Sequence, residues 1–431
     1  MKHLFGGLQW AVFLIATSIA APIAIAHAFG MDVTETALFV QRTILVLGIA
    51  CMVQAFIGHR LPINEGPAGL WWGIFVVYAG MVGVIYPTAK DSLQALQSGM
   101  MYSGVLFILL AVFGLVSKMK KLFTPAVTFT YLLLLVLQLS GTFISGMLGI
   151  EGKGDPIDGT VVFGSIAVII ITFITMNHKV TWVSKYSVLL SIGLGWLIFL
   201  LLGKTTSFSS HSERLIELPK LLVYGKPIWD SGMFVTAVFI TLLLIANMMA
   251  SIRVMENLFK KGFSISAPDR VKEGSIASGI NHLFAGLFSA IGPVPISGAA
   301  GFVSATRLVS MIPFVVGSII IVAITFFPDV MSLFATLPAP VAYAVTFAIF
   351  TKMVEMAFNE LASDPNQSQA YKVAAFGLMI GVGLMSVPAE SMAGLPNVLV
   401  ATLSNGLITG TIIAIVIEQF LLKRYKGIRR Y

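Results

Sequence analysis

Two short stretches of this chain place polar, glycine and proline residues inside otherwise apolar sequence. The first, LPINEGPAGLW at 61–71, holds a carboxylate, Glu65, directly before Gly66. The second, VPISGAAGFV at 294–303, repeats the order of proline, isoleucine, polar residue and glycine in the second half of the chain. Proline and glycine interrupt helices, and half-helices beyond two such breaks can aim their N–H groups at a shared site. The two stretches therefore predict a two-sided binding site.

Glu65 is the residue of these stretches that could carry acid–base chemistry. A carboxylate can accept two N–H bonds from the edge of a planar ring. Within a membrane protein it could also take up and release a coupling proton. The alternative is a solvated carboxylate at the membrane surface, paired with Arg60 or His59. We expect Glu65 to bind substrate and to carry the coupling proton.

The composition of the chain places both stretches in a membrane protein. Hydrophobic residues make up 57% of the 431 residues and charged residues 11%, with a mean hydropathy of +0.93. A soluble domain of this size would need a more charged surface. The single cysteine, Cys51, excludes an internal disulfide. Metal-ligand clusters, nucleotide-binding loops and nucleophile–base pairs are not found, so we expect no cofactor, no enzyme and no ATP-driven pump.

Apolar segments separated by polar or Gly/Pro-rich turns predict fourteen membrane spans, each near the roughly 20 residues that cross a bilayer. For the first segment a cleavable signal peptide is the alternative, but Gln9 and Pro22 favour an uncleaved span. The predicted spans are 8–30, 36–58, 62–85, 99–117, 123–148, 160–177, 182–203, 230–257, 275–291, 293–309, 311–327, 333–356, 370–387 and 394–422.

The distribution of charge predicts the orientation of these spans. With an even number of spans and a cytoplasmic N-terminus, 20 of the 27 basic residues fall on the inner side and 11 of the 19 acidic residues on the outer side. This is the bias of the positive-inside rule. Both termini are therefore expected in the cytoplasm, and the net charge of +8 reflects topology and does not indicate a nucleic-acid partner.

The longest polar connection divides the predicted spans into two sets of seven. It runs from Lys204 to Asp230, and an odd number of spans in each half predicts an inverted repeat. The stretches at 61–71 and 294–303 then open the third and the tenth span, which are equivalent positions. The predicted fold is an all-α polytopic membrane protein of 7+7 inverted repeats. Its broken third and tenth spans carry short antiparallel strands that satisfy the freed backbone.

Three segments give the chain a resemblance to the nucleobase–ascorbate transporters, also called the nucleobase:cation symporter-2 family. GLQW…ATSIAAPI at 7–23 resembles the family's first span, and RLPINEGPAGLW at 60–71 resembles the glycine-containing segment of its third span. PISGAAGFVSATR at 295–307 matches the glycine and the Thr-Arg ending of the tenth-span signature. The resemblance covers nearly the whole chain in the number and spacing of spans.

The resemblance implies a core domain and a gate domain, with a nucleobase bound between them beside the two strands. The core would comprise spans 1–4 (residues 1–118) and 8–11 (230–327). The gate would comprise spans 5–7 (119–229) and 12–14 (328–431). It also implies a proton as the coupling ion and a homodimer formed through the gate domain.

The chain departs from the family at the positions that usually bind the base. The eighth-span Glu and the residue four positions later are replaced by Asn247 and Ser251, and the tenth-span pair by Gly298 and Ala299. The first-span His is Trp10, and Gly69 stands where the family has a stacking Phe, so that this stacking surface is either lost or moved to Trp71 or Trp10. The predicted substrate-binding residues are Glu65, Gly66, Gly69, Thr17, Asn247, Ser251, Ser297, Gly298 and Ala299.

These observations predict a permease for a nucleobase-like purine or pyrimidine in the cytoplasmic membrane. The alternative is an anion transporter of the same seven-plus-seven architecture, for sulfate or a carboxylate, because helix N-termini attract anions. Glu65 distinguishes the two, since an ionised acid in the pocket would repel an anion.

Overall fold

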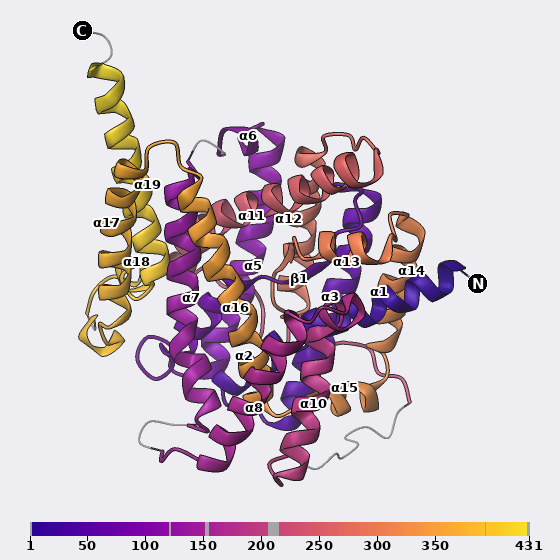
Figure 1. Cartoon of the computed structure of the whole chain (residues 1–431). Coiled ribbons are helices and arrows are strands. Elements are labelled where there is room, and N and C mark those ends of the chain that lie inside the picture. The colour runs from indigo at the N-terminus through magenta and orange to yellow at the C-terminus, as the bar shows by residue number, and fades with distance from the viewer. Residues whose placement is uncertain (1, 120–121, 151–154, 206–214, 393, 429–431) are drawn as a thin grey trace.

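The computed structural model describes residues 2–119, 122–150, 155–205, 215–392 and 394–428, and it is built almost entirely from helices (Figure 1). The helices of the first half are α1 (Lys2–Ser18), α2 (Ala20–Ala28), α3 (Val33–Phe56), α4 (Gly69–Ala79), α5 (Ala89–Val112), α6 (Val116–Met119), α7 (Pro125–Met147), α8 (Gly159–Met176), α9 (Thr181–Lys185) and α10 (Ser187–Leu201). Those of the second half are α11 (Ser231–Phe263), α12 (Val271–Leu287), α13 (Ala299–Thr306), α14 (Met311–Ile324), α15 (Pro328–Ala335), α16 (Ala339–Ala362), α17 (Gln367–Met385), the 3₁₀ turn η1 (Ala389–Met392), α18 (Asn397–Leu403) and α19 (Gly406–Ile428).

Eight helices of the described chain are long and apolar enough to cross a membrane, or up to ten if each of two bent helix pairs is one span. The bent pairs are α14 with α15, at 90°, and α18 with α19, at 83°. Helix α8 shows a lipid-facing stripe, because Phe163, Ile166, Ile170 and Ile174 are all exposed on one side of it. The chain is thus a multi-pass membrane protein. The count of fourteen spans, which includes shorter segments, stays a prediction.

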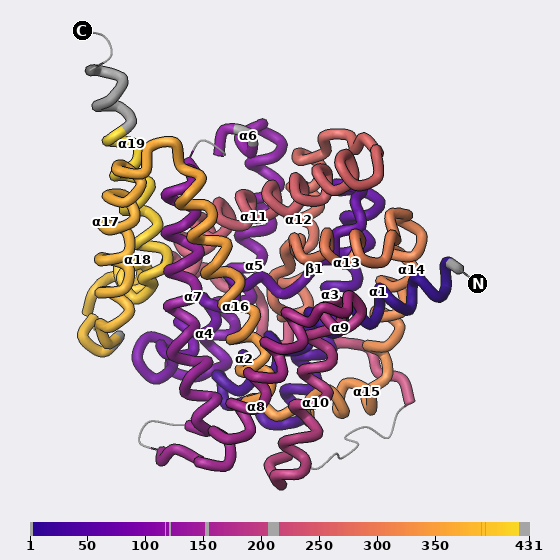
Figure 2. Tube along the Cα trace, viewed as in Figure 1, coloured from indigo at the N-terminus to yellow at the C-terminus, as the bar shows by residue number. Residues whose placement is uncertain are grey.

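The helices pack in two groups (Figure 2). In the first group α5 packs on α12, α1 on α14 and α3 on α14. In the second group α7 packs on α16 and α19, α17 on α19, and α8 on α10. Glycines allow the closest of these approaches: a Cβ on Gly377 or Gly381 of α17 would lie 2.9 or 2.8 Å from the carbonyl oxygen of Gly410 or Gly406 on α19. Small residues at such contacts are typical of helix packing in membranes.

The segment 215–230, which precedes α11, lies along the first group of helices. Glu217 N–H donates to Phe326 O at 2.9 Å, and Leu222 N–H donates to Leu287 O at 2.8 Å. The Gln97 side chain of α5 donates to Gly225 O at 2.7 Å. Residues 215–230 therefore form a strap across α5, α12 and α14, and we use the name strap for this segment below.

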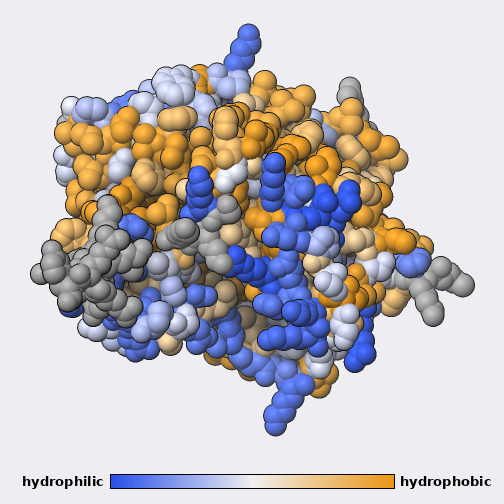
Figure 3. Space-filling model, turned by 90° about the horizontal axis from the view of Figure 1, so that it is seen from above, coloured by the Kyte–Doolittle hydropathy of each residue, from blue (hydrophilic) through white to orange (hydrophobic). Residues whose placement is uncertain are grey.

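Charged residues gather at the ends of the bundle. Figure 3 views the end at which α11 finishes and α12 begins, where polar and charged residues cluster beside a broad apolar rim. Lys260, Lys261 and Lys272 are exposed there. The N-cap residues Asp32 of α3 and Asp158 of α8 accept backbone N–H bonds at helix starts. Such capping satisfies N–H groups that the first turn of a helix leaves free.

Candidate functional site

Two three-residue strands meet at the centre of the first group of helices. Strand β1 (Glu65–Pro67) pairs antiparallel with β2 (Pro293–Pro295), with Gly66 opposite Val294. The pairing continues at both ends, because Ala68 N–H donates to Gly292 O at 3.0 Å and Ile296 N–H donates to Asn64 O at 2.9 Å. These bonds satisfy backbone that cannot be helical next to Pro62, Pro67, Pro293 and Pro295. Helices α4 and α13 then leave the strand pair at opposite ends.

Neighbouring helices hold both strands in place. The Ser251 hydroxyl of α11 donates to Pro295 O at 2.8 Å, so the predicted contact residue Ser251 fixes β2. Glu65 N–H donates to Cys51 Sγ of α3 at 3.2 Å. A Cβ on Gly66 would overlap Ile296 Cδ1, so the glycine allows the close pairing of the strands. The predicted residues Ser251 and Gly66 thus shape the backbone of the site.

Glu65 is fully buried and neither of its carboxylate oxygens has a hydrogen-bond partner among the described residues. Arg60 is exposed and its Nε donates to Phe56 O at 3.2 Å, whereas His59 Nδ1 accepts the Leu61 N–H at 3.1 Å. The alternative of a solvated Glu65 paired with Arg60 or His59 is therefore wrong. The bond from its backbone N–H to Cys51 Sγ places Glu65 next to α3.

Asn64, which is absent from the predicted set, completes the polar edge of β1. Its Nδ2 donates to Thr17 Oγ1 at 3.3 Å, while its Oδ1 is buried without a partner among the described residues. Thr17 lies where α1 gives way to α2, because Pro22 has no N–H to donate to the carbonyl of Ser18. The sequence does contain a signal for Asn64: Pro-Ile-Asn at 62–64 is the counterpart of Pro-Ile-Ser at 295–297, and Ser297 is in the predicted set.

The other predicted residues of the tenth span lie at the start of α13. Ser297 is half-buried, Gly298 is exposed and Ala299 is buried. Gly298 is the N-cap of the helix, and the Ala299 N–H donates to Ile296 O at 3.1 Å. The N–H group of Ala299, a residue that we predicted to bind substrate, is therefore used within this turn. Ser297 and Gly298 are more accessible than Ala299.

Asn247 and Gly69 lie farther from the strand pair. Asn247 is half-buried on α11, one turn before Ser251. Gly69 opens α4 and faces the second helix group, since a Cβ there would be 3.7 Å from Leu135 of α7 and from Phe350 of α16. Gly69 therefore marks the place where the two groups of helices meet beside the site.

Both tryptophans considered for the stacking surface are buried in this structure. Trp71 is fully buried and its Nε1–H donates to His282 Nε2 at 3.0 Å. Trp10 is also fully buried, with ring centroids 4.5 Å from Phe302 and 5.0 Å from Phe314. Both rings are parts of the packed core, and the expectation that one of them replaces the missing Phe stays a prediction.

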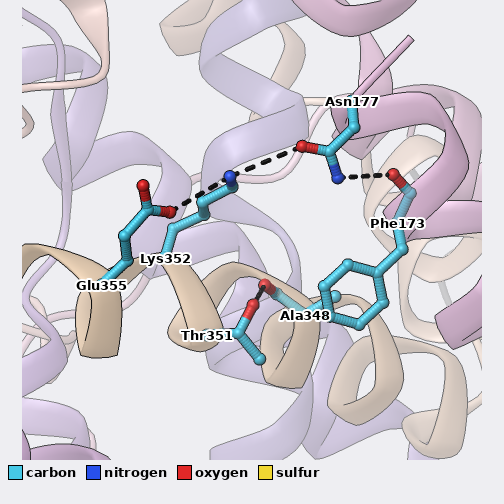
Figure 4. A network of polar contacts seen from close by, with 6 residues as sticks. All are labelled: Phe173, Asn177, Ala348, Thr351, Lys352 and Glu355. Carbon is cyan, nitrogen blue, oxygen red and sulfur yellow. Dashed lines mark hydrogen bonds and ion pairs between the residues drawn. The ribbon is translucent and has the colours of Figure 1, made fainter.

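A polar network joins two helices of the second group away from the strands (Figure 4). Lys352 Nζ of α16 lies 3.3 Å from Glu355 Oε2 and 3.5 Å from Asn177 Oδ1, which follows α8. Asn177 Nδ2 in turn donates to Phe173 O at 2.9 Å. This network lies within one helix group. In the part of the chain that the structure describes, three or more His, Cys, Asp or Glu residues nowhere form a group that could hold a metal ion.

Apolar helices that cross a membrane several times, and two broken segments that meet at a buried polar strand pair, define a membrane permease. The model of a permease family, Xan_ur_permease, matches residues 1–390. The chain belongs to this family, that of the nucleobase–ascorbate transporters, and the resemblance drawn from the sequence is confirmed. Its relatives are named as transporters and not as enzymes.

Relatives of similar length and solved structures also match this chain. The chain is 43% identical over 429 residues to "Putative purine permease YwdJ" of Bacillus subtilis, covering 98% of this chain and 97% of the relative. It is 25% identical over 430 residues to "Uric acid permease PucJ" of the same organism, covering 97% and 92%. The transmembrane domain of the cyanobacterial bicarbonate transporter BicA has a TM-score of 0.63 at 15% identity and 96% coverage of both chains. At that identity the likeness concerns the fold alone.

Proposed function

We propose that this protein is a secondary transporter that moves a purine or a related nucleobase across the cytoplasmic membrane. The observation that carries the proposal is the buried edge of β1, where Asn64 Oδ1 and both Glu65 oxygens lack partners among the described residues. Buried polar groups without partners are costly, and the alternating N–H and C=O groups of a nucleobase would pair with them. The names of the relatives, purine and uric acid permeases, point to the same class of substrate.

The transport mechanism that fits this arrangement is alternating access by two domains built from seven-plus-seven inverted repeats. The first group of helices would be the core domain, with residues 1–118 and 230–327, and the second group the gate domain. Packing within each group supports this division, except that α15, which begins the second gate segment, packs on α3 of the first group. The strap at 215–230 bonds to α5 and α12, so we move the end of the first gate segment from residue 229 to the connection after α10.

The proposed orientation places both termini in the cytoplasm. The exposed Lys260, Lys261 and Lys272 support it, because they lie in the last turn of α11 and the first turn of α12 and because the positive-inside rule places such basic residues on the cytoplasmic side. Asp32 and Asp158 cap helices that begin at the other end. A homodimer formed through the gate domain stays a prediction from the family.

A proton is the proposed coupling ion and Glu65 its carrier. A carboxylate without a cationic partner in an enclosed membrane site is stable only when it is protonated or when a ligand pairs with it. The protonated carboxyl group of Glu65 can donate its O–H to a ring carbonyl oxygen and accept a ring N–H at its other oxygen. Substrate and proton would then bind together, each favouring the binding of the other, which couples them as a symport.

Uptake by purified protein in liposomes tests the proposed function. Hypoxanthine, xanthine, urate, uracil, sulfate and bicarbonate are supplied one at a time, and a thermal-shift assay of the detergent-solubilised protein runs in parallel. We expect saturable uptake of at least one nucleobase, and we expect the same compound to raise the unfolding temperature, because a ligand that binds only the folded state stabilises it. Uptake of sulfate or bicarbonate without any nucleobase would establish the anion-transporter alternative instead.

A further inference from the structure

A cavity of about 370 Å³ lies between the two helix groups, away from the strand pair. It opens where α2 and α10 end and where α3, α8 and α16 begin, at the lower end of the bundle in Figure 1. None of the residues that line it belongs to the strand-pair site. By the proposed orientation this is the outer end of the protein, so that a solute from outside meets this cavity first.

The ion pair of Asp158 and Lys204, whose Oδ2 and Nζ lie 2.6 Å apart, is part of the cavity wall, which also includes the polar residues His27, Thr36 and Thr205. Asp158 Oδ1 already accepts the N–H groups of Thr160 at 2.9 Å and Val161 at 3.2 Å. A carboxylate oxygen accepts two bonds and an ammonium group donates three. The pair therefore keeps one acceptor position on Asp158 Oδ2 and two N–H donors on Lys204, side by side.

The hydrogen bond from Lys204, together with the N–H groups at the start of α8, holds the pKa of Asp158 below its ordinary value. Its carboxylate is therefore ionised at neutral pH and acts as an acceptor. Both side chains are partly exposed, 42% for Lys204 and 31% for Asp158, so a solute can reach them. An adjacent acceptor and donor match the lactam edge, –NH–C(=O)–, of an oxopurine or oxopyrimidine.

The remaining wall is mostly apolar and suits the faces of a flat ring. Ile23, Phe199 and the Pro338–Pro340 segment line it, and a cavity of this size with apolar walls and few polar groups is typical of small-molecule sites. Beside the wall residues Ile23 and His27, the Tyr343 hydroxyl donates to Ala24 O at 2.9 Å and lies 3.2 Å from His27 Nδ1. This contact joins α16 of the second helix group to α2.

We propose that this cavity is an outer entry site, at which Asp158 and Lys204 bind the lactam edge of the transported heterocycle before Tyr343 moves aside. The inference rests on the proposed function, because that function supplies the class of solute. A simple anion fits less well, since the Asp158 carboxylate lies beside the only cation that this described wall contains. The site would raise the local concentration of substrate at the closed outer face.

A single engineered cysteine reports whether the cavity is occupied. Cys51, the native cysteine, is buried, so Ala339→Cys on the cavity wall is the reactive thiol. In liposomes with the outer face exposed, its labelling rate by an impermeant maleimide is measured with hypoxanthine, xanthine or urate present. We expect the transported oxopurine to slow labelling at least fivefold at saturation. Leu221→Cys on the strap, outside the cavity, should label at the same rate with or without the compound.

A second substitution separates binding in the cavity from closure driven by the strand-pair site. In the Ala339→Cys background, Lys204→Met should raise at least fivefold the oxopurine concentration that gives half-maximal protection from labelling. Two controls should leave this concentration unchanged. Lys204→Arg keeps the N–H donors, and Lys226→Met changes an exposed lysine outside the cavity. An unchanged midpoint in Lys204→Met, or no protection by any oxopurine that is transported, would overturn the entry site and leave the proposed function intact. If no oxopurine is transported at all, the uptake assay shows that the proposed function itself has failed.

Discussion

At the scale of single residues, Asn64 and Glu65 are neighbours at the start of β1 and offer different chemistry. The side chain of Asn64 donates to Thr17 Oγ1 of α1, and the backbone N–H of Glu65 donates to Cys51 Sγ of α3. The amide can both donate to and accept from a ring, whereas the carboxyl group can pair with a ring and can also hold a proton.

Asn64→Leu should weaken substrate binding without unfolding the protein. Leucine has a similar volume but cannot pair with Thr17 Oγ1 or with a ring. Loss of one buried hydrogen bond costs about 1.5 kcal/mol, or roughly tenfold in affinity, so we expect KM for uptake to rise about tenfold. Asn257→Leu, an exposed asparagine of α11, is the matched control. Wild-type KM in Asn64→Leu would remove Asn64 from the site.

Glu65→Gln should separate uptake from the proton gradient. Glutamine resembles the protonated acid and cannot release a proton, so uptake that rises with an inward proton gradient in the wild type should become independent of external pH between about 5.5 and 8. The measurement is initial uptake into liposomes at each pH. Glu360→Gln, which removes an exposed carboxylate of α16, should keep the wild-type profile, and a wild-type profile in Glu65→Gln would exclude Glu65 as the carrier.

At the scale of elements, hydropathy and breaker residues locate most helices but not their bends. The spans predicted at 36–58, 123–148 and 160–177 correspond to α3, α7 and α8. One span is predicted over 394–422, whereas α18 and α19 meet there at 83°. The break lies at Asn405, whose side chain accepts the Ile408 N–H at 3.1 Å and caps α19. An average over twenty apolar residues conceals such a single polar turn.

The Tyr343 contact gives a prediction about how α16 meets α2. Gly146 of α7 makes room for this ring, since a Cβ there would overlap it. Tyr343→Phe keeps the ring and removes the bonds to Ala24 O and His27. A loss of about 1 kcal/mol should open the outer face roughly fivefold more often, seen as faster labelling from outside of Ser297→Cys, which lies next to the strand pair. Tyr131→Phe, within α7, is the control, and an equal rate in both variants would contradict the role of Tyr343.

At the scale of the whole molecule, sequence predicts the site better than it predicts the depth of each residue. The similar sequences Pro-Ile-Asn and Pro-Ile-Ser predict that 61–71 and 294–303 lie together. The structure places them together, because β1 pairs with β2. Burial of Glu65 and of Trp71 depends on contacts with α3 and α12 that no local pattern contains. The position of the strap could not be predicted from the sequence either, because its bonds are not local. The bond to α5 joins residues more than a hundred positions apart, and the bond to α12 joins residues some sixty positions apart.

The strap also predicts which parts move together. Because Gln94 of α5 donates to Lys226 O at 2.8 Å, the strap should travel with the core domain, and the boundary to the gate should lie before residue 215. Cysteines at Gln94 and Lys226, joined by a short bifunctional thiol reagent, should therefore leave uptake unchanged.

A second pair of cysteines, at Lys185 of α9 and Phe302 of α13, would instead join the two helix groups, since Lys185 Nζ lies 4.9 Å from the centroid of the Phe302 ring. Joining them should abolish uptake, and reduction should restore it; each single-cysteine variant treated with the reagent is the control. Full uptake with the second pair joined, or loss of uptake with the first, would mean that the boundary between the moving domains lies elsewhere.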